Sequence, residues 1–201
     1  MLMDKSALAM YAILACLSGA AASNETTSET TDVCLTPGTD YIGLDFMAFD
    51  QTMDAGWREV ANREGCAVAA ADLIEEYRTT KSDLSEGMLS TMRWHEGQMR
   101  AEAGQNEHAI ILFKTTYKDA EKDSFGWNYY VDATIAFLAQ DREALNEARE
   151  QLAALPRPSG MSMTDPDGNP VKIDWPPNLK VVDNFLSCFG KDYAAAYGEC
   201  K

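Results

Sequence analysis

The feature of this chain that most constrains its fold is an apolar periodicity of three to four residues from Phe46 to Leu155. Such spacing places apolar side chains along one face of an α-helix. The pattern is interrupted by short turns around Gly65, Gly104 and Gln140. Because short turns between helices produce antiparallel pairs, we predict an all-α fold of stacked helical hairpins.

The three turns mark a repeated unit, since they lie 39 and 36 residues apart. The first unit is expected to open with a helix that Asp45 caps and Gly65 ends. Small or apolar residues follow each turn by four or five positions, where they let two helices approach closely. These residues are Ala69, Ala70, Ala109, Ala144 and Leu145.

The middle unit carries the most specific pattern. A glycine lies in its first helix, a second glycine marks the turn, and a small residue and then a bulky one follow in the second helix. These residues are Gly97, Gly104, Ala109 and Phe113. With Trp94 one position from the expected tryptophan, this unit resembles the tetratricopeptide repeat family. The first and third units lack the glycine of the first helix and have longer periods, so the related Sel1-like repeats remain the alternative.

The resemblance implies a binding groove. In tetratricopeptide proteins the first helices of successive hairpins line a concave surface that holds peptides or partner proteins. An aromatic and amide-bearing groove of this kind can hydrogen-bond an extended backbone and stack on its side chains. Ordinary packing between helices is the alternative role for each residue. The positions implied here are Asn62, Trp94, Gln98, Tyr130 and Thr134.

The N-terminus is typical of an export signal. Residues 1–22 combine a short basic start with an apolar run too short to span a bilayer. Cleavage after Ala22 competes with a lipobox that would leave a lipid anchor at Cys16, and the apolar Leu17 favours the first site. Residues 23–33 are polar and are expected to form a disordered linker.

The acidic composition excludes one class of partner. The chain has a formal net charge of -15, which repels phosphate backbones and anionic lipids. We therefore expect no nucleic-acid binding, and no membrane insertion once the signal is removed. A periplasmic or secreted location in a bacterial envelope is favoured over a lipoprotein.

The cysteines agree with export. Cleavage after Ala22 leaves an even number, which suits an oxidising compartment but allows three disulfide connectivities. Loop closure favours near neighbours. A zinc site is the weaker alternative, because no two cysteines have the short spacing of zinc clusters. The predicted pairs are Cys34 with Cys66 and Cys188 with Cys200.

The composition and the apolar spacing of the chain change after Pro156. Residues 156–177 hold six of the seven prolines, with alternating apolar residues around the turn DPDGNP. This predicts a small β-hairpin, favoured over a calcium loop because the EF-hand spacing and its distal glutamate are missing. Residues 178–201 return to helical spacing and are predicted to cap the open end of the helical-repeat region 34–155.

Sequence patterns for catalysis are weak. His95 and His108 are 13 residues apart on different predicted helices, so a structural or solvent-facing role is favoured for both. Neither a GxSxG elbow nor a glycine-rich phosphate loop occurs. We therefore predict no catalytic residue, no metal site and no cofactor.

The sequence thus predicts an exported scaffold that binds a peptide or protein partner in the cell envelope. The alternative is an exported hydrolase or small-molecule-binding protein, with its site between the repeats and residues 156–177, since long irregular segments are often functional. A purely structural envelope tether is the third hypothesis.

Overall fold

The computed structural model describes residues 33–165, 167–171, 174–198 and 200. The expected signal peptide 1–22, Cys16 and all but the last residue of the linker 23–33 lie outside the described residues. Within the described ranges, no helix has the length and apolar character needed to cross a membrane.

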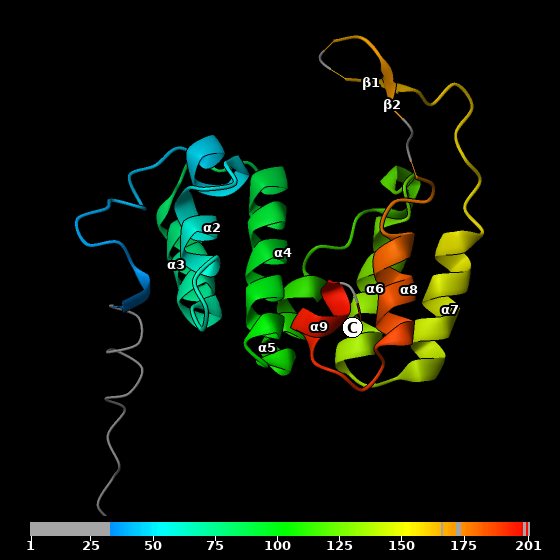
Figure 1. The fold of residues 1–201 in the computed structure, drawn as a ribbon. Helices are drawn as coiled ribbons and strands as arrows, with labels where there is room; N and C mark the ends of the chain where they lie inside the picture. Colours follow the sequence, from blue (N-terminus) through cyan, green and yellow to red (C-terminus); the bar gives the residue numbers. More distant parts are fainter. Residues whose placement is uncertain (1–32, 166, 172–173, 199, 201) are drawn as a thin grey trace, which may run out of the picture.

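The fold is helical, as predicted, with one short pair of strands (Figure 1). A π-helical turn and a 3-10 turn, Met47–Gln51 and Ala120–Lys122, accompany the α-helices. The α-helices are α2 (Gly56–Ala61), α3 (Ala67–Thr80), α4 (Glu86–Glu102), α5 (Asn106–Lys114), α6 (Trp127–Leu138), α7 (Arg142–Ala153), α8 (Leu179–Ser187) and α9 (Tyr193–Tyr197). The strands are β1 (Met163–Thr164) and β2 (Pro170–Val171).

The three predicted turns share one backbone conformation. Gly65, Gly104 and Gln140 have φ angles of 78°, 75° and 58°, and each lies two residues before the next helix. At Gly104 and Gln140 this left-handed residue directly follows the C-cap, where it ends the helix and reverses the chain, which glycine does at least cost. The prediction that Gly65 ends the first helix is wrong, because α2 ends at Ala61 with Asn62 as its C-cap, and Gly65 belongs to the turn that follows. Each helix from α2 to α7 packs against the next in sequence, so the chain forms a continuous helical array.

One predicted helix is wrong. The segment from Asp45 to Gly65 was expected to be a single helix, but the structure breaks it between Gln51 and Gly56. Gly56 has φ of 58°, and a Cβ there would overlap the Phe49 carbonyl oxygen. This close backbone approach folds α2 back against the π-helical turn, a contact that apolar periodicity cannot reveal.

Helix α4 lies between two apolar cores. Met92 belongs to the core formed with α2 and α3, whereas Trp94 and Ala101 belong to the core formed with α5 to α9. Between them, the carboxylate of Glu96 is fully buried and 2.5 Å from the Nε of Arg78. This long helix therefore joins the two halves of the array.

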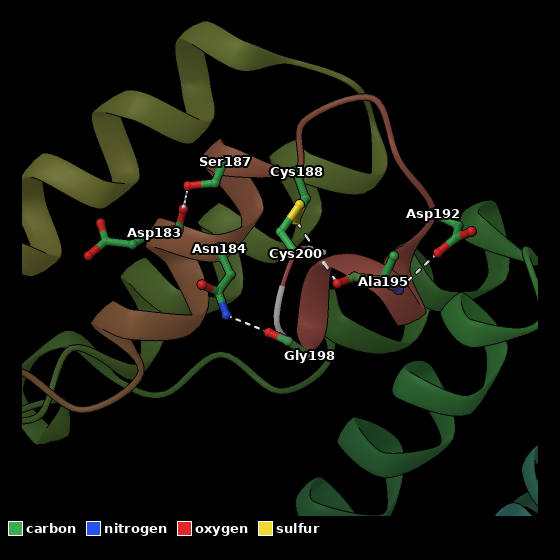
Figure 2. The surroundings of a disulfide bond; sticks show 8 residues. All are labelled: Asp183, Asn184, Ser187, Cys188, Asp192, Ala195, Gly198 and Cys200. Atoms are coloured by element: carbon green, nitrogen blue, oxygen red, sulfur yellow. Dashed lines mark hydrogen bonds between the residues drawn. A yellow bond between two sulfur atoms is a disulfide. The ribbon is translucent and has the colours of Figure 1, made fainter.

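The last two helices, α8 and α9, pack against different parts of the helical array. Helix α8 packs on α6 and α7 at the end of the array, while α9 turns back and contacts α4 (Figure 1). Figure 2 shows how α9 is held against α8: Asn184 donates a hydrogen bond from Nδ2 to the Gly198 carbonyl at 2.5 Å. Asp192 caps α9 by accepting from the backbone N–H of Ala195 at 2.8 Å.

Both predicted disulfides are confirmed. The Cα atoms of Cys34 and Cys66 are 5.6 Å apart and those of Cys188 and Cys200 are 5.8 Å apart, both within the normal range for disulfides. The first bridge joins the N-terminal segment to the start of α3, and the second joins the chain after α9 to the end of α8 (Figure 2).

Within the segment 156–177, strands β1 and β2 lie away from the helical array (Figure 1). Strands β1 and β2 pair antiparallel, with Met163 opposite Val171. At the base of the segment, Trp175 donates from Nε1 to the Leu155 carbonyl at 2.9 Å, and its ring contacts Phe125. Residues 166 and 172–173 of the predicted hairpin lie outside the described residues.

Candidate binding site

A hollow of about 520 Å³ opens between α4, α6 and α9. This volume is in the range of small-molecule and peptide-side-chain pockets. We call it the α4–α6 hollow. Its lining residues are Gly87, Ser90, Thr91, Trp94, His95, Gln98, Lys118, Trp127, Tyr130, Asn178 and Tyr197.

Aromatic rings form one continuous cluster at the hollow. The ring centroid of Trp94 lies 4.5 Å from that of Trp127 and 5.0 Å from that of Tyr130. Behind it, the Phe113 ring is 4.4 Å away and fully buried. Trp94 is therefore held rigidly, with 6% of its surface exposed, whereas Tyr197 is 40% exposed. The hollow thus presents a fixed aromatic base with the half-buried ring of Trp127 and the more exposed ring of Tyr197 at its surface.

Two buried tyrosine hydroxyls beside the hollow, those of Tyr130 and Tyr193, are neutral. Burial raises the pKa of Tyr130 well above its ordinary value, and Tyr193 and Tyr197 act in the same direction. Burial also raises the pKa of Tyr193, and this effect outweighs the side chain of Gln98, which acts to lower that pKa. Tyr130 and Tyr193 therefore remain protonated at neutral pH, and they add no charge beside the hollow.

His95 is oriented by a buried carboxylate. Its Nδ1 lies 2.7 Å from Oδ1 of Asp50, a residue with no exposed surface. Asp50 also accepts from Trp57 Nε1 at 2.8 Å and from Gln51 Nε2 at 2.5 Å. Burial alone would raise the pKa of Asp50, but the hydrogen bonds and the charge of His95 outweigh it and lower that pKa.

These contacts determine which edge of the His95 ring faces the site. An ionised Asp50 only accepts hydrogen bonds, so the proton of the contact resides on Nδ1 of His95. The opposite edge of the ring, which carries Nε2, is then the edge available to the hollow. A neutral His95 offers a hydrogen-bond acceptor there, and a protonated one offers a donor.

Lys118 supplies the fixed positive charge. The side chain of Asn128 holds its backbone through two hydrogen bonds, accepting from the Lys118 N–H at 2.9 Å and donating to its carbonyl at 2.8 Å. The ammonium lies 5.1 Å from the centroid of the Trp127 ring. Trp127 in turn donates from Nε1 to the Thr116 carbonyl at 2.8 Å. The base of this side chain is therefore well anchored.

The structure brings together three of the five predicted binding residues. Trp94, Gln98 and Tyr130 line the α4–α6 hollow. Thr134 is fully buried and donates to the Tyr130 carbonyl at 2.8 Å, which makes it part of the packing beneath the site. Asn62 is exposed in a separate hollow that also includes Ala194.

Helix α9 is the reason for this separation. It contributes Ala194 to the hollow beside Asn62 and Tyr197 to the α4–α6 hollow. The continuous groove that the resemblance implies is therefore divided by the C-terminal helix of the same chain.

Sequence reasoning missed several residues of the site. The 13-residue spacing of His95 and His108 predicts a structural or solvent-facing role for His95, and it carries no sign of the contact with Asp50, which lies 45 residues earlier and outside its helix. Lys118, Trp127, Asn178 and Tyr197 were not proposed for binding. The high aromatic content of 124–130 and 193–197 was a signal for an aromatic site, but only their packing against α4 brings them together.

No family model, curated protein or solved structure matches this chain. Within the ranges that the structure describes, no group of three or more His, Cys, Asp or Glu side chains is placed to hold a metal ion. The geometry of the α4–α6 hollow is therefore the basis for a functional argument.

Proposed function

We propose that this protein is an exported helical-repeat scaffold that binds a peptide, or an extended segment of a protein partner, in the cell envelope. The observation that carries the proposal is the aromatic cluster of the α4–α6 hollow, in which rigid Trp94 and accessible Tyr197 line one concave site. Rigid aromatic residues in a concave site are typical anchors of binding energy.

A tetratricopeptide-like arrangement of the hairpins is supported by equivalent packing after each turn. Five residues beyond the turn positions lie Ala70, Ala109 and Leu145, and none of them has exposed surface. In the middle unit, Gly97 lies directly against the ring of Phe113. These positions are those at which the repeat requires close approach of two helices.

An extended peptide suits the chemistry of the hollow. The amides of Gln98 and Asn178 and the hydroxyls of Ser90 and Thr91 line it beside the rings. Amide groups can both donate to and accept from a peptide backbone. A location in an oxidising compartment is supported by the two disulfides and by the signal-like N-terminus.

Selection of binding peptides from a synthetic library tests the proposed binding function. Synthetic hexapeptides of random sequence are passed over the immobilised protein, and retained peptides are identified by mass spectrometry. We expect enrichment of a related set that Tyr197→Ala loses by about tenfold or more, since an exposed ring in a site carries 1–2 kcal/mol. The matched control is Tyr117→Ala, which removes a ring that is 43% exposed and outside the hollow. Absence of any enriched set, or equal loss in both variants, would refute the proposal.

The pair of His95 and Asp50 favours a second candidate function, hydrolysis. With Asp50 accepting from Nδ1, Nε2 can take a proton from a water whose oxygen attacks an acyl carbon, then return it to the leaving alcohol. This candidate predicts release of 4-nitrophenol from 4-nitrophenyl esters and its loss in His95→Gln. A wild-type rate no higher than that of His95→Gln removes it.

A further inference from the structure

The charge of the α4–α6 hollow differs from that of the protein as a whole. The chain carries 32 acidic residues against 17 lysines and arginines, yet no aspartate or glutamate lines this hollow. Lys118 and His95 are the basic residues among its lining. The α4–α6 hollow is therefore a site without carboxylates on a molecule whose net charge repels anions.

Arg58 brings a second cation to the same region. Its guanidinium lies 4.1 Å from the centroid of the Trp57 ring, and Trp57 is next to His95, with 5.2 Å between ring centroids. Burial lowers the pKa of Arg58, while the charges of Asp50 and Tyr197 act to raise it. The Nε of Arg58 is buried without a hydrogen-bond partner among the described residues.

One buried carboxylate beside His95, that of Asp50, is already engaged in hydrogen bonds. Asp50 accepts from His95, Trp57 and Gln51 and has no exposed surface. Its negative charge offsets part of the positive charge of Arg58, whereas the ammonium of Lys118 lies over the Trp127 ring. Lys118 therefore remains the principal cation for a ligand.

We infer that the α4–α6 hollow recognises a free carboxylate attached to an apolar or aromatic group. The carboxylate faces Lys118, Arg58 adds to the positive potential, and the apolar group packs on Trp127 and Tyr197. This inference rests on the proposed binding function and specifies its ligand. A peptide C-terminus and a free aromatic acid share this chemistry, and the experiment distinguishes them.

The experiment compares matched probes. Peptides enriched in the hexapeptide selection are synthesised with a free C-terminal carboxylate and with a C-terminal amide, and their affinities are measured by calorimetry. We expect the free acid to bind about tenfold more tightly, which is the effect of one charge-assisted hydrogen bond. The preference should shrink in Lys118→Gln and persist in Lys114→Gln, which removes an exposed lysine outside the hollow.

The outcomes separate the two proposals. Equal affinity of acid and amide, with the dependence on Tyr197 preserved, overturns the carboxylate inference and leaves the binding function in place. If no peptide is enriched at all, the binding function fails and the inference with it. A third probe, 3-phenylpropionate, identifies the source: affinity equal to that of the best peptide indicates a free aromatic acid, and much weaker affinity indicates a peptide C-terminus.

Salt gives an independent readout. Raising sodium chloride from about 50 to about 500 mM should weaken binding of the free acid and leave the amide nearly unchanged, because screening acts on the charge contact. The same salt response for both probes would contradict a carboxylate contact.

Discussion

Gly97 of α4 and Phe113 of α5 are in such close contact that a Cβ on Gly97 would lie 2.6 Å from Cε1 of the Phe113 ring. The ring itself is fully buried and packs behind Trp94 of the α4–α6 hollow. This one contact sets how closely the two helices approach and supports the aromatic base of the candidate site.

Gly97→Ala should therefore destabilise the fold by about 1–3 kcal/mol, the cost of overpacking a filled core. The matched control is Gly87→Ala on the same helix, where the nearest atom to a new Cβ is 3.9 Å away. Without a clash, this change should be neutral or add up to about 1 kcal/mol. Urea unfolding followed by circular dichroism measures both, and equal free energies for the two variants would contradict the contact.

Asp50→Asn should weaken the fold by about 2–4 kcal/mol at pH 7, because Asp50 is buried and accepts three hydrogen bonds. The pKa of Asp50 is lowered in the folded state. Its ionisation therefore stabilises the fold above the ordinary pKa of aspartate, and this contribution is lost as pH falls through the lowered value.

The difference between wild type and Asp50→Asn should accordingly shrink below about pH 4. Asp54→Asn, an exposed change of equal charge four residues away, serves as the control and should stay within about 0.5 kcal/mol of wild type. A gap that is constant from pH 7 to pH 3 would show that the Asp50 charge contributes no stability.

Glu96→Gln should cost about 3–5 kcal/mol, the penalty for breaking a buried ion pair. Glu96 has no exposed surface, and its carboxylate meets Arg78 at 2.5 Å and Arg100 at 3.7 Å. Glu86 lies on the same helix and pairs with Arg93 at 2.7 Å, but its side chain is 78% exposed. Glu86→Gln should therefore cost less than about 1 kcal/mol. Thermal unfolding of both variants tests whether burial separates the two pairs.

Removal of the bridge by Cys188→Ala with Cys200→Ala should cost about 3 kcal/mol, because the bridge closes a short loop over a separation of 12 residues. The five-residue α9 is too short to be stable alone. Amide hydrogen exchange should accordingly rise at 193–198 and leave α3 unchanged. The corresponding Cys34 and Cys66 double variant, with a separation of 32, should cost about 4 kcal/mol. Protection of α9 that survives loss of its bridge would show that packing alone holds it.

The sequence by itself determined the helical class, the turn positions and the cysteine pairs. Each depends on local physics. Apolar residues at helical spacing define a buried face, a left-handed glycine ends a helix at Gly104, and loop closure favours cysteines that are near in sequence. The αL conformation of Gln140 follows the same rule of position, although its side chain makes it less favourable.

Only the tertiary structure decided the composition of the candidate site. The close approach at Gly56 brings Trp57 and Asp50 together, and the contact of Asp50 with His95 spans 45 residues. The return of α9 onto α4 divides the predicted groove and adds Tyr197. These contacts join segments whose periodicity says how each one folds but not where it packs, because packing depends on complementary surfaces that lie far apart in the chain.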